Sequence, residues 1–293
     1  MVAHRDSAST VRWVECPRDA WQALPVRIPS ESKRAHLQSL LDAGFRHLDL
    51  GSFVSPRAVP QMADTEEVLR QLDRPEGSDF LCIIGNMRGF ERAAAGDHVG
   101  SLGYPLSLNE TFQLRNTGRD LESSWRLVED LREACDGADM ELVVYISMGF
   151  GNPYGEEWSP ADTAGAVTRL RDMGIARIAV ADTVGRADAL LVEKVLAAID
   201  RPRDLGLHLH ARPGAWEPLL QSAWQCGVGW FEGALSGAGG CPFAGDALVG
   251  NLPSESVLPW LADRGLLTGV QLERLPKLAE EAAELAAYGA GGS

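Results

Sequence analysis

The sequence predicts an α/β fold, a (β/α)₈ TIM barrel with an extra helix at its C-terminal end. Short apolar segments alternate with amphipathic segments along the chain, and eight such pairs precede the last helix. No linker or change of composition divides the 293 residues, and 45% of them are hydrophobic, enough for one large core. A doubly wound open sheet is the alternative for the same alternation.

Each predicted strand is a short apolar run that ends in polar or glycine residues. The fourth strand is the least defined, because its apolar residues are spread over a longer segment. In chain order, the strands are expected within Val11–Glu15, His47–Leu50, Phe80–Ile84, Val99–Leu108, Leu142–Met148, Ile178–Ala181, Leu205–His210 and Trp230–Ala234.

The predicted helices carry apolar stripes and recognisable ends. Ser30 is expected to cap the first helix, which stops near Gly44, and Ser159-Pro160 opens a later helix with a cap followed by proline. In the helix Asp120–Cys135, apolar residues recur every three or four positions. The other helices are expected at Asp64–Leu72, Arg88–Ala95, Leu190–Ile199, Trp216–Cys226, Ser254–Arg264 and Leu275–Ala287.

The two ends of the chain are expected to be flexible around a single domain of residues 11–288. Met1 to Thr10 is polar and lacks the apolar core of a signal peptide, and Gly289 to Ser293 is a glycine-rich tail. No stretch reaches the roughly 18 apolar residues needed to cross a bilayer. We therefore expect a cytoplasmic protein.

Charge and cysteine content restrict the partners. The formal net charge of -14 disfavours a broad nucleic-acid or membrane surface, although a few local arginines can still receive an anionic substrate. Five scattered cysteines without metal-binding spacing fit reduced thiols better than a disulfide framework. They are Cys16, Cys82, Cys135, Cys226 and Cys241.

A pair of histidines lies on the seventh predicted strand, Leu205–His210. Side chains alternate faces along a strand, so His208 and His210 project from the same face. Two imidazoles at this spacing can share one divalent metal ion if a carboxylate joins them. The alternative is two buried, hydrogen-bonded histidines in a core.

Polar side chains follow most of the predicted strands, where a barrel places its chemistry. Asp19, His208, His210 and Asn251 are expected to meet around one ion, because strands one, seven and eight are neighbours once the barrel closes. One carboxylate, two imidazoles and an amide oxygen suit Mg²⁺, Mn²⁺ or a related divalent ion. Glu232, on the eighth strand, is expected to be a buried partner for an arginine or a histidine.

Several motifs, in order from about Val11 to Leu275, resemble those of hydroxymethylglutaryl-CoA lyases. The segment Cys16–Gln22 reads CPRDAWQ and is similar to the family's GPRDGLQ. The segments that follow the second, fifth and sixth strands resemble family blocks, as do the glycine-rich loop and the asparagine motif. These segments are Asp49–Pro56, Asn152–Gly155, Asp182–Gly185, Gly239–Ala244 and Gly250–Leu252.

The resemblance implies a metal-dependent carbon–carbon lyase that cleaves a 3-hydroxy-3-methylglutaryl-CoA-like substrate by retro-aldol (Claisen-type) chemistry. It implies Asp19, His208, His210 and Asn251 as metal ligands, with Arg18 polarising the thioester carbonyl and stabilising the enolate. Cys241 would close the site and protonate the enolate. The residues implied as catalytic are Arg18, Asp19, His208 and Cys241, and those implied as substrate-binding are Gln22, Asp49, Tyr145 and Thr183.

The chain also departs from the family pattern. Where the family reads HCHDTYGQ, residues 208–215 read HLHARPGA, so the aspartate and threonine after the second histidine are absent. Val143 stands where the family has an arginine, and Asn152 stands where it has a cysteine. The ligands survive while other residues around them differ, which predicts retained chemistry on a changed substrate.

Two further functions remain open from the sequence. One is an aldolase or condensing enzyme of the same superfamily acting on a different acyl or keto-acid substrate. The other is a non-catalytic homologue that serves as a binding subunit. For the lyase, the expected partner is a small-molecule acyl substrate, with a coenzyme A thioester as a candidate, and the expected assembly is a homo-oligomer, a dimer.

Overall fold

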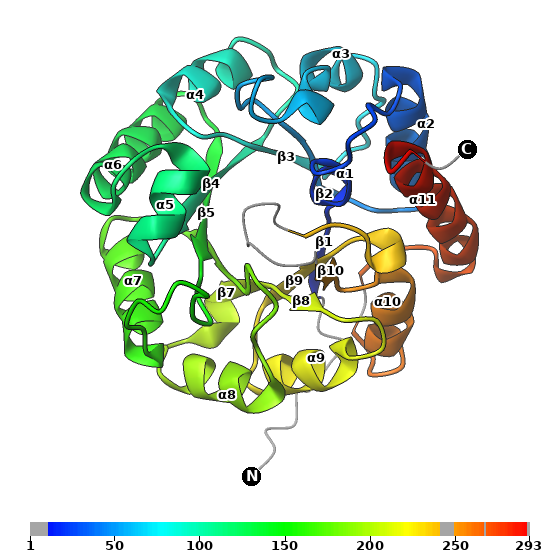
Figure 1. Ribbon diagram of the computed structural model, residues 1–293. Helices are drawn as coiled ribbons and strands as arrows, with labels where there is room; N and C mark the ends of the chain where they lie inside the picture. Colours follow the sequence, from blue (N-terminus) through cyan, green and yellow to red (C-terminus); the bar gives the residue numbers. More distant parts are fainter. Residues whose placement is uncertain (1–10, 241–248, 267, 292–293) are drawn as a thin grey trace.

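Eight parallel strands form a closed barrel in the computed structural model, which describes residues 11–240, 249–266 and 268–291. The last barrel strand pairs with both the seventh and the first, so the sheet has no free edge (Figure 1). This confirms the predicted TIM barrel and excludes the open sheet. The barrel strands are β1 (Arg12–Glu15), β2 (His47–Ser52), β3 (Asp79–Ile83), β4 (Ser101–Ser107), β5 (Glu141–Ser147), β6 (Arg177–Ala181), β7 (Leu205–His208) and β9 (Trp230–Gly233).

A ring of helices surrounds the barrel (Figure 1). Asn86, Asp120 and Asp188 each cap a helix through a side-chain oxygen, and Ser159 forms a capping box with Asp162. The outer helices are α2 (Ser30–Asp42), α3 (Thr65–Leu69), α4 (Met87–Ala94), α6 (Leu121–Gly137), α7 (Pro160–Asp172), α8 (Ala189–Ala197), α9 (Trp216–Gln225), α10 (Ser254–Ala262) and α11 (Leu275–Gly289). Short 3₁₀ turns are η1 (Pro60–Met62), η2 (Pro202–Asp204), η3 (Leu235–Gly237) and η4 (Leu272–Arg274).

The predicted cap at Ser30 is wrong. Helix α2 begins at Ser30 itself, and Pro29 occupies the cap position without a side-chain hydrogen bond. The Ser30 hydroxyl instead donates to Asp64 at 2.8 Å, and the buried ammonium of Lys33 donates to the same carboxylate. The Ser30 hydroxyl is therefore used in a tertiary contact and not, as the local sequence pattern predicts, in capping the helix.

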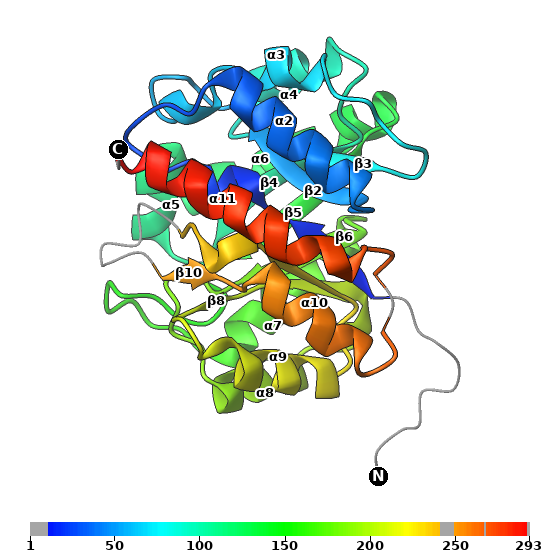
Figure 2. The same ribbon diagram turned by 90° about the vertical axis from the view of Figure 1, so that its right-hand side faces the viewer.

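Four short elements that were not predicted lie near the mouth of the barrel. Helix α1 (Pro17–Trp21) follows β1, and α5 (Glu110–Thr117) follows β4. The predicted strand Leu205–His210 breaks at Leu209. Its last residue, His210, begins β8 (His210–Ala211), which pairs with β10 (Gly250–Asn251) in antiparallel fashion (Figure 2). This two-stranded ribbon stands at the mouth, beside the barrel.

The interior of the barrel is packed. Trp230, Val143 and Leu81 belong to a small apolar cluster inside the ring of strands, separate from the larger core between strands and helices. A Cβ atom on Gly206 would lie 2.2 Å from the indole of Trp230, so only glycine leaves room for this ring. Because the interior is filled, a ligand site has room only at an end of the barrel.

Helix α11 lies against α2 (Figure 2). Its last residue, Gly289, accepts a hydrogen bond from the Val26 backbone N–H at 2.8 Å. The flexible tail from Gly289 stays a prediction. Within the described part of the chain, no helix is both long and apolar enough to cross a membrane. The cytoplasmic location stays a prediction.

Candidate metal centre and active site

A cavity of about 290 Å³ opens at the mouth of the barrel, at the C-terminal ends of the strands. Its polar lining includes residues that end or follow β1, β6 and β7. Its apolar lining includes Val59, Ile83 and Phe112. Among the predicted site residues, the cavity is lined by Arg18, Asp19, Gln22, Tyr145, Thr183, His208 and His210.

The two histidines meet as predicted. His208 ends β7 and His210 begins β8, and their ring centroids lie 4.8 Å apart. His208 Nδ1 lies 2.8 Å from Glu232 Oε2, and His210 Nδ1 lies 2.7 Å from the backbone oxygen of Asp182. Both of these oxygens accept, so each Nδ1 carries the ring proton and donates. The Nε2 atoms are then left with free lone pairs, which is the arrangement of metal-binding histidines.

Asp19 completes a group of three ligands. One oxygen of its carboxylate and one nitrogen of each of His208 and His210 all lie within 4.8 Å of one another. Burial would raise the pKa of the Asp19 carboxyl, but His210 and Arg18 outweigh burial and lower this pKa below its usual range. Asp19 is therefore an anion at neutral pH, as a cation ligand requires.

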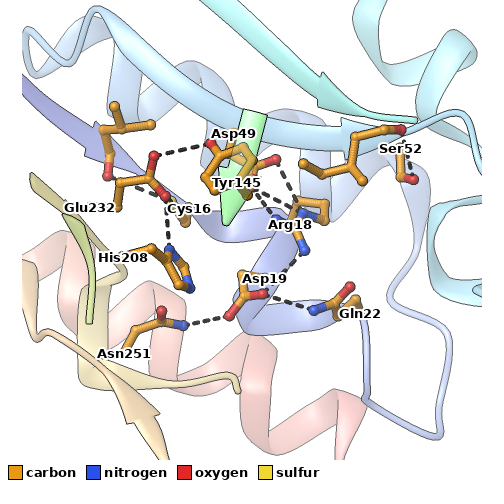
Figure 3. Close-up of polar contacts among 12 residues, drawn as sticks. Cys16, Arg18, Asp19, Gln22, Asp49, Ser52, Tyr145, His208, Glu232 and Asn251 are labelled. Carbon is orange, nitrogen blue, oxygen red and sulfur yellow. Dashed lines mark hydrogen bonds and ion pairs between the residues drawn. The ribbon is translucent and has the colours of Figure 1, made fainter. Parts of the chain in front are cut away.

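Two buried acceptors beside this carboxylate have no hydrogen-bond partner among the described residues. They are His210 Nε2, which lies 3.9 Å from Asp19 Oδ2, and Asn251 Oδ1. The Asn251 amide nitrogen donates to Asp19 Oδ2 and to the Ala238 carbonyl, both at 2.8 Å, so the amide oxygen is oriented away from these two atoms (Figure 3). Buried acceptors without partners are rare in proteins. A cation held by Asp19, His208, His210 and Asn251 would satisfy them, so the residues present fit a metal ion.

The ribbon of β8 and β10 brings Asn251 to this place. Asn251 stands opposite His210 in the antiparallel register, although the two are far apart in sequence. The glycine-rich segment before β10 approaches closely: Gly239, with φ +110°, leaves no space for a Cβ atom, which would lie 2.5 Å from the Asn251 amide nitrogen. The next residue, Gly240, donates its N–H to Asp19 Oδ2 at 3.3 Å.

Arg18 lies on α1 with its guanidinium held by two carboxylates (Figure 3). Its Nε donates to Asp49 at 3.0 and 3.1 Å, its Nη2 donates to Asp49 as well, and its Nη1 donates to Asp19 Oδ1 at 3.1 Å. Burial would lower the pKa of Arg18, but the charges of Asp49 and Asp19 outweigh it and raise this pKa. Burial raises the pKa of Asp49 to about 6 against the opposing charge of Arg18, so both groups are charged at neutral pH.

Asp49 is fully buried behind Arg18 and is not among the residues that line the cavity. It reaches the cavity only through the guanidinium that it orients. Its predicted role in binding substrate directly has no support in this geometry, whereas a role in supporting Arg18 does.

Glu232 is a buried acceptor beneath the histidines, one of the two roles expected from the sequence. It accepts hydrogen bonds from His208 and from the Tyr145 hydroxyl, at 3.0 Å, and a longer contact from the Cys16 thiol at 3.8 Å (Figure 3). Burial would lower the pKa of His208, but its hydrogen bond to Glu232 and the charge of Glu232 raise it overall.

Cys16, His208 and Glu232 form a second group with metal-ligand spacing. In this group His208 would bind through Nδ1, which already donates to Glu232. Burial first, and the charge of Glu232 next, raise the pKa of the Cys16 thiol well above its usual value, so the thiol keeps its proton. The group around Asp19 is therefore the better metal site.

Two further predicted residues, Gln22 and Thr183, make hydrogen bonds beside the cavity. Gln22 donates to Asp19 Oδ1 at 2.8 Å, and the Thr183 hydroxyl accepts from the Met148 N–H at 2.8 Å. Cys241 lies outside the described residues, so its predicted catalytic role stays a prediction.

Glu15 is a buried carboxylate that belongs to none of the motifs in the sequence. Its place at the end of a buried strand is the signal in the sequence that points to it.

Comparisons with known proteins agree with this geometry. A family model described as HMGL-like matches residues 10–281. The chain is 32% identical over 264 residues to the mitochondrial hydroxymethylglutaryl-CoA lyase of Mus musculus, with 88% of this chain and 80% of that protein covered. It is 29% identical over 262 residues to a hydroxymethylglutaryl-CoA lyase of Bacillus subtilis, with 88% and 87% covered.

Solved structures of such lyases superpose closely. The hydroxymethylglutaryl-CoA lyase of Pseudomonas aeruginosa matches with a TM-score of 0.87 and 29% identity, over 97% of this chain and 94% of that one. An HMG-CoA lyase from Acinetobacter baumannii, solved in complex with coenzyme A and 3-methylmalate, matches with a TM-score of 0.87 and 28% identity, over 98% and 93%.

These findings confirm the resemblance seen in the sequence and the reaction class it implies, a metal-dependent carbon–carbon lyase that uses retro-aldol chemistry. The chain belongs to the HMGL-like family.

Proposed function

We propose that this site cleaves a 3-hydroxy acyl thioester related to hydroxymethylglutaryl-CoA into a thioester enolate and a keto acid. One observation carries the proposal: a nitrogen of His208 and a nitrogen of His210 lie within 4.8 Å of an oxygen of the Asp19 carboxylate, in the cavity that the Arg18 guanidinium also lines. The site therefore combines a place for a cation with a fixed positive charge.

Asp19, His208, His210 and Asn251 would hold a divalent ion. Their mixture of carboxylate, imidazole and amide oxygen suits Mg²⁺ or Mn²⁺. When bound, such an ion supplies Lewis-acid chemistry, since it can hold the substrate hydroxyl and a neighbouring oxygen together. Glu232 and the Asp182 carbonyl fix the tautomers of the two histidines, so that both Nε2 atoms stay available.

Arg18 would stabilise the charge that develops during cleavage. The hydroxyl loses its proton, its oxygen becomes a carbonyl, and the bond between C2 and C3 breaks with its electron pair passing to the thioester enolate. Asp49 and Asp19 hold the guanidinium in place before substrate arrives, so little reorganisation is needed when the enolate forms. A planar guanidinium also matches an enolate oxygen better than an ammonium would.

Proton transfers complete the reaction. Asp19, predicted to be catalytic, is the group proposed to accept the hydroxyl proton. His208, also predicted to be catalytic, carries its ring proton on Nδ1 toward Glu232 and would use Nε2 for the ion, so its proposed role is that of a ligand. Cys241, the residue directly after Gly240 in the sequence, is proposed to deliver a proton to C2 of the enolate. These transfers balance the cleavage, because one proton leaves the hydroxyl and one returns to carbon.

The proposed acyl carrier is coenzyme A. The lyase from Acinetobacter baumannii was solved in complex with coenzyme A and 3-methylmalate, and its fold superposes on this chain. In this chain, Val59, Ile83 and Phe112 line the cavity and offer apolar contacts to aliphatic parts of such a substrate. A homo-oligomeric assembly stays a prediction.

Metal analysis and turnover of the purified protein test the proposal together. The protein should hold about one divalent ion per chain, and a chelator should abolish cleavage of hydroxymethylglutaryl-CoA or a related thioester until Mg²⁺ or Mn²⁺ is returned. His210→Ala should lose metal and turnover together, whereas the control His98→Ala, whose side chain is 38% exposed and does not line the cavity, should keep both. Full turnover of a metal-stripped sample would overturn the assignment.

A further inference from the structure

Glu15 is a carboxylate buried at the end of β1, with 1% of its surface exposed. It receives hydrogen bonds from three directions. Trp13 Nε1 donates at 3.0 Å from the same strand, the Leu235 N–H donates at 2.6 Å, and the Ser254 hydroxyl donates to the oxygen that Trp13 also reaches. This carboxylate does not line the cavity.

Two of these donors flank the segment that carries Asn251. Leu235 begins η3, before the glycine-rich segment, and Ser254 begins α10, three residues after Asn251. A further contact ties the same flanks together, because the Ala234 N–H donates to the Leu252 carbonyl at 3.0 Å. The chain therefore leaves the barrel and returns to it at points fixed by one carboxylate.

The anchored segment touches Asp19 twice, through the Asn251 amide and through the Gly240 N–H. Asp19 itself follows Glu15 by four residues, on the helix that continues from β1. The carboxylate that anchors the segment and the carboxylate that the segment contacts thus belong to one short stretch of chain. The hydrogen bonds to Glu15 therefore couple the position of Asn251 to the stretch of chain that carries Asp19.

We propose that Glu15 is a positioning residue that fixes Asn251 for metal binding by anchoring both flanks of its segment. This inference rests on the proposed function, because it requires Asn251 to be a metal ligand. Closing a long segment costs conformational entropy, and hydrogen bonds to a buried carboxylate at both flanks hold the ends at a set separation. A ligand displaced by a fraction of an ångström binds metal less well, which is why supporting partners affect metal affinity.

Ser254→Ala tests the inference, with Trp13→Phe as its matched control. Each substitution removes one hydrogen bond to the same carboxylate oxygen of Glu15, but only Ser254 connects that oxygen to the segment of Asn251. Metal affinity is measured by competition with a chelator for Mn²⁺, and thermal unfolding is measured alongside. Ser254→Ala should weaken Mn²⁺ binding about 10-fold, in the range found for outer partners of metal ligands. Trp13→Phe should leave the affinity within about twofold, even where it lowers the melting temperature as much.

A double-mutant cycle shows whether Ser254 acts through Glu15. In a Glu15→Gln background, Ser254→Ala should weaken Mn²⁺ binding by much less than 10-fold, because the carboxylate it serves is already gone. Equal losses in both backgrounds, or equal losses in Ser254→Ala and Trp13→Phe, would overturn the inference. Asn251→Ala distinguishes a failure of the proposed ligand set from a failure of the anchoring role. Unchanged Mn²⁺ affinity in Asn251→Ala would contradict the ligand set. Weakened affinity in Asn251→Ala together with unchanged affinity in Ser254→Ala would contradict the anchoring role alone.

Discussion

Replacing Arg18 by glutamine should lower stability as well as turnover. Arg18 makes all the side-chain hydrogen bonds to Asp49 that the described residues provide, and Asp49 is fully buried. Removing one partner of a buried ion pair leaves an uncompensated charge, which typically costs about 3–5 kcal/mol of folding free energy. Loss of a strong donor to the enolate should separately lower kcat by about 10²–10³-fold.

The double variant Arg18→Gln with Asp49→Asn separates these two effects. It removes the stranded charge, so most of the lost stability should return in denaturant unfolding at pH 7, while kcat stays at least about 10²-fold below that of the unaltered protein. The single variant should also lose less stability at pH 5 than at pH 7. Without the nearby cation the pKa of the Asp49 carboxyl rises further, and protonation then neutralises it. A double variant with near-normal turnover would refute the role given to Arg18, and a single variant as stable as the unaltered protein would refute the electrostatic argument.

Three further predictions address the surroundings of the metal site. Glu232→Gln should weaken Mn²⁺ binding by about 10–100-fold in chelator competition, since an amide no longer fixes the His208 tautomer, and unchanged affinity would contradict this support. Burial raises the pKa of Glu15 from 4.5 to about 7, so its contribution to stability is full below about pH 4.5 and is lost as the pH rises to about 7. That change of about 3 kcal/mol should be absent in denaturation of Glu15→Gln. Finally, the altered residues after His210 predict that hydroxymethylglutaryl-CoA is a poor substrate, and a kcat/KM of about 10⁴ M⁻¹s⁻¹ or more would show this expectation to be wrong.

Local patterns were sufficient for the barrel and for most of the site. Short apolar runs marked the strands, and the alternation of leucine and histidine placed both imidazoles on one side, as their ring separation of 4.8 Å bears out. The prediction succeeded there because strand periodicity and the closure of a barrel are both properties that a single sequence carries.

The features that the sequence does not predict depend on contacts between residues that are distant in sequence. The strand with the histidines breaks at Leu209 because β10, some 40 residues later, offers His210 a better pairing than the barrel does. Helix α1 is five residues long, too short for a periodic signal. In the sequence, Glu15 is only the last residue of a strand. Its hydrogen bonds with Leu235 and Ser254, both distant in sequence, give its carboxylate the proposed positioning role.

Barrel closure also sets the order in which this protein can acquire its metal. Asp19 follows the first strand and His208 ends the seventh, and β9 is the strand hydrogen-bonded to both β1 and β7. A nascent or truncated chain that lacks β9 therefore holds the histidines but has no fixed place for the carboxylate beside them. A metal ion that binds only the closed barrel stabilises it relative to partly folded chains. This stabilisation grows with the concentration of free metal. If the proposed ligands come together only on barrel closure, excess metal should slow unfolding and leave the rate of refolding unchanged. Bound metal would then mark the chains that have completed their fold.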